Sequence, residues 1–423
     1  MDAFTYRNGA LHAEDVPLAR IVELAGTPTY VYSATAMTAR LKALQAAFAG
    51  QRVRFFYAMK ANDHLAVLRT LSNAGAGVEI VSGGELARAL AAGVAPGDIL
   101  FAGVGKTRDE LAEALAAGIA QFNVESVPEL RALNEVALGQ GRQAPVALRI
   151  NPDVAARTHA KISTGSYGDK FGIAHDEAAD ALALAWSLPG IRVAGLHLHI
   201  GSQITDAGPL TEAYARLVDL ARLFAEKGRR LERLDFGGGF GVRYQKGQAS
   251  IDLAALAAQV RRLTEGLDVE IAFEPGRFLV AEAGALLARV VYVKENAGRR
   301  FAILDAGMND LVRPAMYDAR HEIVPLREPD ASDAHGRVDV VGPVCESADI
   351  FGRDRILAGV QAGDAVALTG AGAYGAVMTS TYNARPKAAE VMVRGDACTV
   401  IRPRQEREAM WADERLPEWL DAR

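Results

Sequence analysis

The sequence predicts an α/β protein that combines a (β/α)8 barrel of the TIM type with a mostly antiparallel C-terminal β domain. Eight short apolar runs alternate with Ala- and Leu-rich helical stretches up to Arg277. Beyond Arg277, strand-like runs follow one another with turns or loops and no long helices between them. We therefore expect a barrel over residues 36–277, a β domain over residues 278–423, and N-terminal strands in residues 1–35 that pair with the β domain.

The eight barrel strands are expected in near-continuous apolar runs, because strands of a parallel barrel are covered on both faces. In chain order the runs are RVRFFYAM, GVEIVS, DILFAG, QFNVES, VALRIN, VAGLHLHI, RLDFGGG and VEIAFEP. A helical pattern follows each of the first seven, and several of these helices end in Gly, the usual left-handed stop. The alternative is an open doubly wound sheet, which would need a Gly-rich turn where this sequence has Lys60.

The β domain is expected in the runs LLARVVYVKE, RRFAILDAG, RVDVVGPV, DAVALTG and AEVMVRG. The N-terminal runs FTYRNGALHA and TPTYVYS are the strands that we expect to join it. Within the barrel, the loop NPDVAARTHAKISTGSYGDKFGI is unusually long. Loops of that length in a compact domain are usually functional or disordered.

Composition excludes several classes of protein. The 423 residues are 50% apolar, which argues against disorder, and their net charge of −5 argues against a dedicated nucleic-acid-binding or membrane-surface protein. Two cysteines exclude a disulfide framework and fit a reducing compartment. The N-terminus shows neither the basic nor the apolar segment of a signal peptide, so a cytoplasmic location is expected.

Polar residues gather at the carboxyl ends of the predicted barrel strands, where barrel enzymes hold their reactive groups. In chain order they are Lys60, Ser82-Gly83-Gly84, Asn151, His197, His199, Ser202, Gly237-Gly238-Gly239, Glu274 and Arg277. A lysine after a strand is often only a solvated strand exit. A lysine aimed into a barrel mouth, however, usually has a chemical reason, since a buried ammonium group is costly. Lysine forms Schiff bases with carbonyl compounds, including pyridoxal phosphate.

The motifs GGGFG and EPGR follow the seventh and eighth strands, whose loops form the phosphate site of many barrels. Glycines let backbone N–H groups approach an anion, and Arg277 offers a bidentate fork. Glu274 could hold a pyridine nitrogen protonated, because opposite charge favours the charged form. The alternative for Glu274 is a salt bridge to Arg277.

His197 and His199 lie two residues apart on one strand and therefore face the same way. A metal site would need further ligands, and none of the other six histidines lies at a predicted strand end, so no metal is expected. One histidine could stack on a flat cofactor while the other is a packed, hydrogen-bonded core residue. The motif FAGVGKT is not an ATP-binding loop, because Leu100 stands where the first glycine would be required.

Seven motifs in fixed order resemble the alanine-racemase-like decarboxylases that use pyridoxal phosphate. They are FFYAMKAN, EIVSGGELARAL, HLHIGSQ, DFGGGFG, EPGRFLV, GPVCESADIF and GAYG. The segments AGMNDLVRPAMYDARHEI and STYNARPKAAEV narrow the resemblance to the branch that decarboxylates meso-2,6-diaminopimelate to L-lysine. The resemblance covers almost the whole chain. Glu79 stands where many relatives have Asp, which is a conservative departure.

The resemblance implies a cofactor site for pyridoxal 5′-phosphate in the barrel. Lys60 would form the Schiff base, and Glu274 would pair with the ring nitrogen. His199 would stack on the ring. The phosphate would be held by Ser202, Gly238, Gly239 and Tyr374.

The resemblance also implies how substrate would bind. Arg277, Arg313, Tyr317 and Tyr374 would grip the carboxylates at the distal end. Glu346 would take the distal ammonium group, and Cys345 would be the acid near the carbanion. In this family Cys345 and Glu346 reach the active site of the partner subunit, so a homodimer with shared sites is expected.

Three alternatives stay open. The chain could decarboxylate another amino acid, such as ornithine, lysine or arginine, but such substrates need an acidic group at the far end, whereas Arg313 suits a second carboxylate. Racemisation on the same fold is disfavoured by the CES and RPxxY motifs. A non-catalytic regulatory homologue would be expected to lose Lys60 or the phosphate loop, and both are present.

Overall fold

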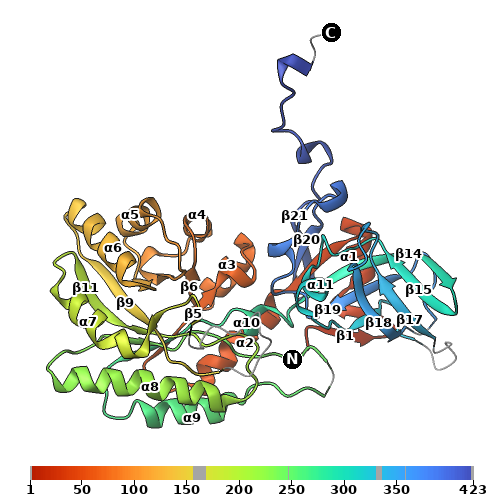
Figure 1. The fold of residues 1–423 in the computed structure, drawn as a ribbon. Coiled ribbons are helices and arrows are strands. Elements are labelled where there is room, and N and C mark those ends of the chain that lie inside the picture. Colours follow the sequence, from red (N-terminus) through yellow and green to blue (C-terminus); the bar gives the residue numbers. More distant parts are fainter. Residues whose placement is uncertain (1, 156–167, 246, 330–335, 358, 421–423) are drawn as a thin grey trace. The chain divides into compact units, whose positions relative to one another are not determined.

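The structure is a computed structural model that describes residues 2–155, 168–245, 247–329, 336–357 and 359–420. The chain forms two compact units, each with its own sheet (Figure 1). The barrel unit comprises residues 36–281, and the β unit comprises residues 1–35 together with residues 282–423. Most of the unusually long loop seen in the sequence, residues 156–167, lies outside the described residues.

Eight parallel strands form the barrel, as the sequence predicts. They are β5 (Val53–Ala58), β6 (Gly77–Ile80), β7 (Ile99–Phe101), β8 (Gln121–Val124), β9 (Ala144–Asn151), β11 (Ile191–His197), β12 (Arg233–Asp235) and β13 (Glu270–Phe273). Their order is β9-β11-β12-β13-β5-β6-β7-β8, and β8 pairs with β9 to close the sheet. The closure excludes the open doubly wound sheet, which would leave two unpaired edges. A two-residue strand, β10 (Ile173–Ala174), adds to β9.

Helices alternate with these strands. They are α2 (Ala34–Ala47), α3 (Leu65–Asn73), α4 (Gly83–Ala91), α5 (Arg108–Ala117), α6 (Val127–Gly139), α7 (Ala178–Ser187), α8 (Ala207–Glu226), α9 (Leu253–Leu263) and α10 (Arg277–Val280). Local sequence explains several boundaries. Thr107 and Glu110 form a reciprocal capping box at the start of α5, and Gly118 ends that helix at a φ of 78°.

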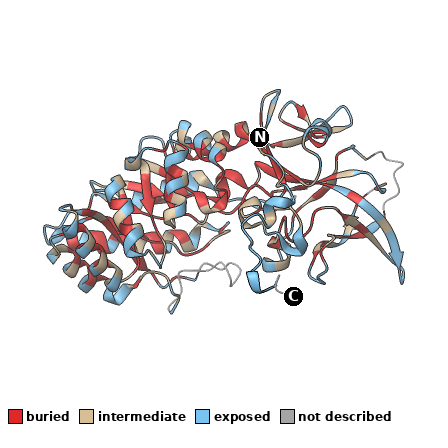
Figure 2. Ribbon diagram, turned by 90° about the horizontal axis from the view of Figure 1, so that it is seen from above, coloured by how far each residue is buried: buried red, intermediate tan, exposed pale blue. Residues whose placement is uncertain are grey.

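Apolar side chains make up most of the core of the barrel unit, inside the strands and between the strands and the helices. Phe56, Leu100 and Ala272 form a fully buried cluster, and the Tyr214 ring of α8 stacks on Phe236 with centroids 4.3 Å apart. Figure 2 shows buried residues concentrated on the strands and exposed residues along the outward faces of the helices. Because the interior is packed, the rim at the strand ends is the place left for polar chemistry.

The β unit is built on a mixed, mostly antiparallel sheet. Its strands are β4 (Thr29–Ser33), β14 (Gly284–Asn296), β15 (Arg299–Leu304), β16 (Ile323–Pro325), β17 (Arg337–Val341), β18 (Ile350–Ile356), β19 (Ala365–Thr369), β20 (Ala389–Arg394) and β21 (Ala397–Arg402). The main path runs β18-β17-β15-β14-β4-β20-β21, and β19 pairs with both β14 and β16. Two of the pairs, β15–β17 and β4–β20, are parallel.

The N-terminal residues belong to this unit, as predicted. Strand β4 lies inside the sheet, antiparallel to β14 and parallel to β20. Strands β1 (Phe4–Arg7), β2 (Ala10–Ala13) and β3 (Val16–Pro17) form a small sheet of their own, followed by α1 (Leu18–Ala25). Their apolar residues share one core with residues of the main sheet, including Val31, Leu287 and Val391.

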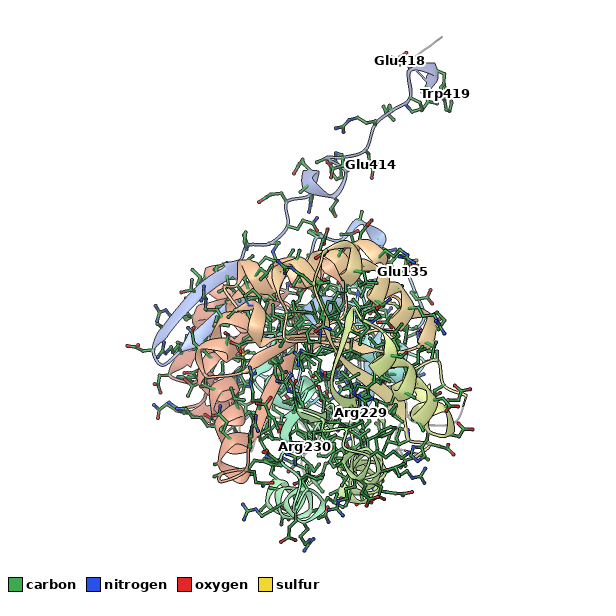
Figure 3. All side chains as sticks on the ribbon, turned by 90° about the vertical axis from the view of Figure 1, so that its left-hand side faces the viewer. Glu135, Arg229, Arg230, Glu414, Glu418 and Trp419 are labelled. Carbon is green, nitrogen blue, oxygen red and sulfur yellow. The ribbon has the colours of Figure 1, made fainter. Side chains whose placement is uncertain are left out.

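The C-terminal segment after β21 contains little regular structure. Figure 3 shows Glu414, Glu418 and Trp419 along it, and the Trp419 side chain is among its exposed apolar groups. Trp411 and Leu416 are exposed as well. Among the described residues, no helix is both long and apolar enough to cross a membrane.

Candidate active site

Lys60 lies at the carboxyl end of β5, in a short 3-10 turn (Met59–Ala61). Its Nζ lies 3.1 Å from both carboxylate oxygens of Glu79 on the neighbouring strand β6. The Glu79 side chain is fully buried, while that of Lys60 is 41% exposed. Glu79 was noted in the sequence only as a departure from relatives, and its pairing with Lys60 was missed. The available signal was a single acidic residue inside an otherwise apolar strand.

Glu274 follows β13 directly and is buried. Its Oε1 accepts a hydrogen bond of 2.9 Å from the Asn123 side chain, and its Oε2 lies 3.1 Å from His197 Nε2. Burial, followed by the nearby Glu79 carboxylate, raises the pKa of Glu274, while the positive charges of Lys60 and Arg149 act in the opposite direction. The alternative of a Glu274–Arg277 salt bridge is wrong, because Glu274 bonds to Asn123 and His197 while Arg277 bonds to Ser202 and Tyr244.

Asp235 ends β12 beside this pair and is also buried. His197, Asp235 and Glu274 each offer one side-chain atom of a type that binds metals, all within 4.8 Å of one another. Burial lowers the pKa of His197 to about 4, and burial together with Glu274 raises the pKa of Asp235 to about 8. These residues could hold a metal by their types. Their geometry is that of a hydrogen-bonded cluster, since the His197 ring faces the Glu274 carboxylate directly. His197 is thus the packed, hydrogen-bonded histidine of the pair.

His199 stands two residues after the last residue of β11, and it is half-buried. The backbone N–H of Gly238 donates to its Nδ1 over 3.2 Å, so that nitrogen carries no proton. Burial, followed by the positive charges of Arg149 and Lys60, lowers the pKa of His199 well below its usual range. The ring is therefore a neutral, flat surface at the barrel rim.

The glycine loop after β12 is tightly packed against its neighbours. A Cβ atom on Gly238 would lie 2.2 Å from the carbonyl oxygen of Glu274, and one on Gly239 would lie 2.5 Å from the carbonyl oxygen of Gly201. Gly239 also has a φ of 100°, which side chains rarely tolerate. Only glycine brings this backbone so close to the strand ends.

Ser202 and Arg277 lie together near the same rim. The Ser202 hydroxyl accepts hydrogen bonds of 3.2 and 3.1 Å from Nε and Nη2 of Arg277. Arg277 is buried, and its Nη1 donates to the Tyr244 hydroxyl over 2.7 Å. Tyr244 was missed in the sequence, where it stands in a polar loop without a motif. A hydroxyl beside a guanidinium group is a suitable place for a phosphate or carboxylate.

Lys106 of the rejected FAGVGKT motif has a structural role. Its side chain is fully buried and lies 2.7 Å from Glu129. Its Nζ also donates to the carbonyl oxygens of Gly103 and Asn123, over 2.6 and 2.9 Å. Lys106 thereby holds the backbone of Asn123, whose side chain bonds to Glu274.

The remaining predicted residues belong to the β unit. Arg313 opens the short helix α11 (Arg313–Tyr317) and is buried, with Nη1 3.0 Å from His321 Nε2. His321 Nδ1 lies 2.9 Å from the carbonyl oxygen of Thr369, so Nδ1 donates and Nε2 accepts from Arg313. Tyr317 is half-buried. His321 was missed because no sequence motif marks it.

Cys345 and Glu346 are exposed, and their loop is held in place. Asp349 accepts hydrogen bonds from the backbone N–H groups of Met308 and Val344, over 2.6 and 2.7 Å. The backbone N–H of Cys345 donates to the Asn383 side chain over 2.8 Å. A cysteine with only a packing role in a core would be buried, and Cys345 is not.

Tyr374, the last predicted residue, is half-buried and has a φ of 56°. The next residue, Gly375, packs so closely on Tyr30 that a Cβ would lie 2.9 Å from its ring. The predicted set therefore divides between the two units. The barrel unit holds Lys60, His199, Ser202, Gly238, Gly239, Glu274 and Arg277, and the β unit holds Arg313, Tyr317, Cys345, Glu346 and Tyr374.

The chain is similar to proteins of known activity over its whole length. The family described as "Pyridoxal-dependent decarboxylase, pyridoxal binding domain" matches residues 34–281. Diaminopimelate decarboxylase of Zymomonas mobilis is 47% identical over 99% of this chain and all of the relative. The crystal structure of diaminopimelate decarboxylase from M. jannaschii in co-complex with L-lysine is 36% identical, with a TM-score of 0.94 over 99% of each chain. That from Helicobacter pylori, complexed with L-lysine, is 39% identical, with a TM-score of 0.90 over 94% of this chain and 99% of the other.

Proposed function

This chain belongs to the pyridoxal-dependent decarboxylases, in the family of the diaminopimelate decarboxylases, and we propose that it binds pyridoxal 5′-phosphate and decarboxylates meso-2,6-diaminopimelate to L-lysine and carbon dioxide. The observation that carries the proposal is the set of groups on one barrel rim. An amine, a neutral imidazole, a buried carboxylate and a tight glycine loop all lie at the ends of neighbouring strands.

The rim residues fit the cofactor. The Gly238–Gly239 backbone packs so closely on the strand ends that no Cβ fits, and the Ser202 hydroxyl lies against the Arg277 guanidinium; both features suit a phosphate group. Glu274 follows the carboxyl end of β13, on the same rim, where it can face a ring nitrogen. We assign Tyr374 to the phosphate as well, on the strength of the resemblance.

The bound cofactor supplies the electron sink for the pair released when the Cα–carboxylate bond breaks. Lys60 supplies the amine that holds the cofactor and is exchanged for the substrate amine. Glu79 keeps the Lys60 side chain aimed at the rim through its two 3.1 Å contacts. Glu274 supplies a negative partner for the ring nitrogen, and the neutral His199 ring can stack without adding a positive charge.

On the strength of the resemblance, we assign substrate contacts to one residue of the barrel unit and four residues of the β unit. Arg277, Arg313, Tyr317 and Tyr374 bind carboxylates, and Glu346 binds the distal ammonium group. The Arg313 guanidinium is held by His321 as a fixed cation, which suits a substrate with a second carboxylate. Ornithine, lysine or arginine would instead need an acid in that place, and these alternatives remain second to diaminopimelate.

We also propose a homodimer with shared sites, in which Cys345 and Glu346 act in the site of the partner subunit. Cys345 donates the proton that replaces the carboxylate at Cα. The exposure of both residues on a loop anchored by Asp349 supports this role, since a thiol needs access to reach a reacting atom.

Product analysis tests the proposal. Incubation with meso-2,6-diaminopimelate and pyridoxal 5′-phosphate should yield L-lysine and carbon dioxide, and the Lys60→Ala variant should yield neither. Release of putrescine from ornithine or of cadaverine from lysine, with diaminopimelate unchanged, would favour the alternative decarboxylases. Absence of both turnover and a visible absorption band from bound cofactor would favour a non-catalytic homologue.

A further inference from the structure

Two carboxyl groups and a histidine are buried together at the ends of β11, β12 and β13. His197, Asp235 and Glu274 are 1%, 0% and 6% exposed, and each places one polar atom within 4.8 Å of the others. Two carboxylates so close together in an unsolvated site repel each other strongly, so one of them is expected to carry a proton. The hydrogen bonds around them indicate which one.

Glu274 is surrounded by donors. The Gln121 side chain donates to Asn123 Oδ1 over 2.7 Å, which turns the Asn123 amide nitrogen toward Glu274 Oε1 at 2.9 Å. His197 Nε2 lies 3.1 Å from Glu274 Oε2. Both oxygens of Glu274 therefore meet a donor, which is the environment that stabilises an ionised carboxylate.

Asp235 is held differently. Its Oδ1 accepts a 2.9 Å hydrogen bond from the backbone N–H of Gly237. Its Oδ2 is buried and accepts no hydrogen bond from any residue that the structure describes. A carboxyl oxygen in this position is satisfied when it carries a proton and donates it to a neighbouring acceptor, and Glu274 is the acceptor at hand. The Asp235 side chain lowers the pKa of Glu274, although burial has the larger, opposite effect.

His197 supports the same assignment. Burial lowers its pKa to about 4, so the ring is neutral at pH 7. A neutral imidazole has one N–H, and the Glu274 carboxylate places it on Nε2. The cluster therefore gains no positive charge from His197 to offset a second carboxylate.

The charged groups around the cluster are paired with one another. Lys60 pairs with Glu79 at 3.1 Å, Arg149 with Glu125 at 2.7 Å, and Arg233 with Glu270 at 2.6 Å. Tyr214 of α8 also faces Asp235, and burial followed by that carboxyl group raises its pKa, so it is neutral. Each of these three cations thus has its own carboxylate, so within the part of the chain that the structure describes none of the three is a dedicated counter-charge for the second carboxyl group of the cluster.

We propose that Asp235 is a positioning residue that is protonated and donates a hydrogen bond to Glu274, so that the cluster carries one negative charge and this charge resides on Glu274. The inference rests on the proposed function, because a single fixed anion matters for a cofactor whose ring nitrogen is to stay protonated. The inference also explains why a second acid lies beside Glu274. Asp235 orients the Glu274 carboxylate and, because it is neutral, adds no second negative charge near the cofactor ring.

Infrared spectroscopy tests the protonation state directly, when the protein contains aspartate labelled with 13C at the side-chain carboxyl carbon. At pH 7 the wild-type protein should show the C=O band of a protonated aspartic acid, with and without cofactor, and this band should be weaker in Asp235→Asn. A remaining part is expected from Asp310, whose pKa burial raises to about 7. The part that Asp235→Asn removes should persist in the wild type at pH 6 and fade as the pH rises above about 8. A wild-type spectrum at pH 6–7 without any protonated aspartic acid, or a band of equal strength in the folded variant, would overturn the proposal.

The absorption spectrum of bound cofactor supplies a second test. The asparagine of Asp235→Asn still has a hydrogen-bond donor, and if Asp235 is neutral the substitution changes no charge. The pH midpoint of the cofactor band should therefore lie within about 0.3 pH units of the wild-type midpoint. Asp235→Leu keeps the volume but cannot donate, and it should move the midpoint by about 1 unit. If Asp235 were ionised, Asp235→Asn would itself shift the midpoint by about 1–3 units. A wild-type protein that binds no cofactor would count against the proposed function, while the infrared band would still decide the state of Asp235.

Discussion

Gly238 packs against the backbone of Glu274, so a substitution at this position tests both the glycine loop and the end of β13. In Gly238→Ala the new methyl group would lie 2.2 Å from the Glu274 carbonyl oxygen and 3.1 Å from the same carbonyl carbon. An ordinary contact is longer than about 3.4 Å, and the atoms in the way belong to the backbone, so the end of β13 has to move by about 1 Å. Overpacking of this kind costs about 1–3 kcal/mol. For a domain of this size each kcal/mol corresponds to about 2–4 °C in the midpoint of thermal unfolding.

Gly238→Ala should therefore lower the midpoint of thermal unfolding by about 2–12 °C in the cofactor-free protein. It should also weaken cofactor binding, because both the loop and Glu274 shift. Gly105→Ala is the matched control, since a Cβ at that exposed position meets nothing within 4 Å and its φ is ordinary. Thermal unfolding by circular dichroism and titration of cofactor fluorescence measure the two effects. Equal stability and equal cofactor affinity in the two variants would refute the crowding argument.

Three further predictions address the proposed chemistry. Borohydride reduction of the cofactor-loaded protein should attach the cofactor to Lys60, as peptide mass mapping would show; attachment to Lys106, which is buried against Glu129, would contradict the assignment. Glu274→Gln should lower kcat and kcat/KM together, because the negative charge acts only as the carbanion develops; an increase in KM alone would make Glu274 a binding residue. Lys60→Ala and Cys345→Ala should each be nearly inactive, yet subunit exchange between them should restore about a quarter of wild-type activity, since half the dimers are mixed and each has one intact site of two. No recovery after proven exchange would place Cys345 and Lys60 in a site within one chain.

Short-range patterns in the sequence identified the barrel and most of the β unit. Most barrel strands lie in near-continuous apolar runs because they are covered on both faces, and these runs are followed by helix-forming residues. Strands β16, β18 and β21 of the main sheet were missed for the corresponding reason. The first has three residues, the second contains Gly352 and several charged residues, and the third, ACTVIR, mixes polar and apolar residues, so none shows a continuous apolar run.

The rim residues were identified by a positional rule. Lys60, His199 and Glu274 each follow an apolar run, and in a parallel barrel all such positions meet at one edge. The residues that bond to these rim residues cannot be identified by their position after an apolar run. Glu79 pairs with Lys60 because β6 lies beside β5, and Tyr244 meets Arg277 from a loop that carries no motif.

The sequence by itself determined the fold class, the order of the barrel strands along the chain and the residues at their ends, because these depend on local alternation and on chain order. Only the tertiary structure decided which polar groups pair and which are buried. It showed that His197 bonds to Glu274, while His199 Nδ1 accepts a hydrogen bond from the backbone N–H of Gly238. It also placed Asp235 beside Glu274, far from it in the sequence. Charge states and hydrogen bonds depend on distances between strands and on the exclusion of water. The spacing of residues along the chain determines neither of these.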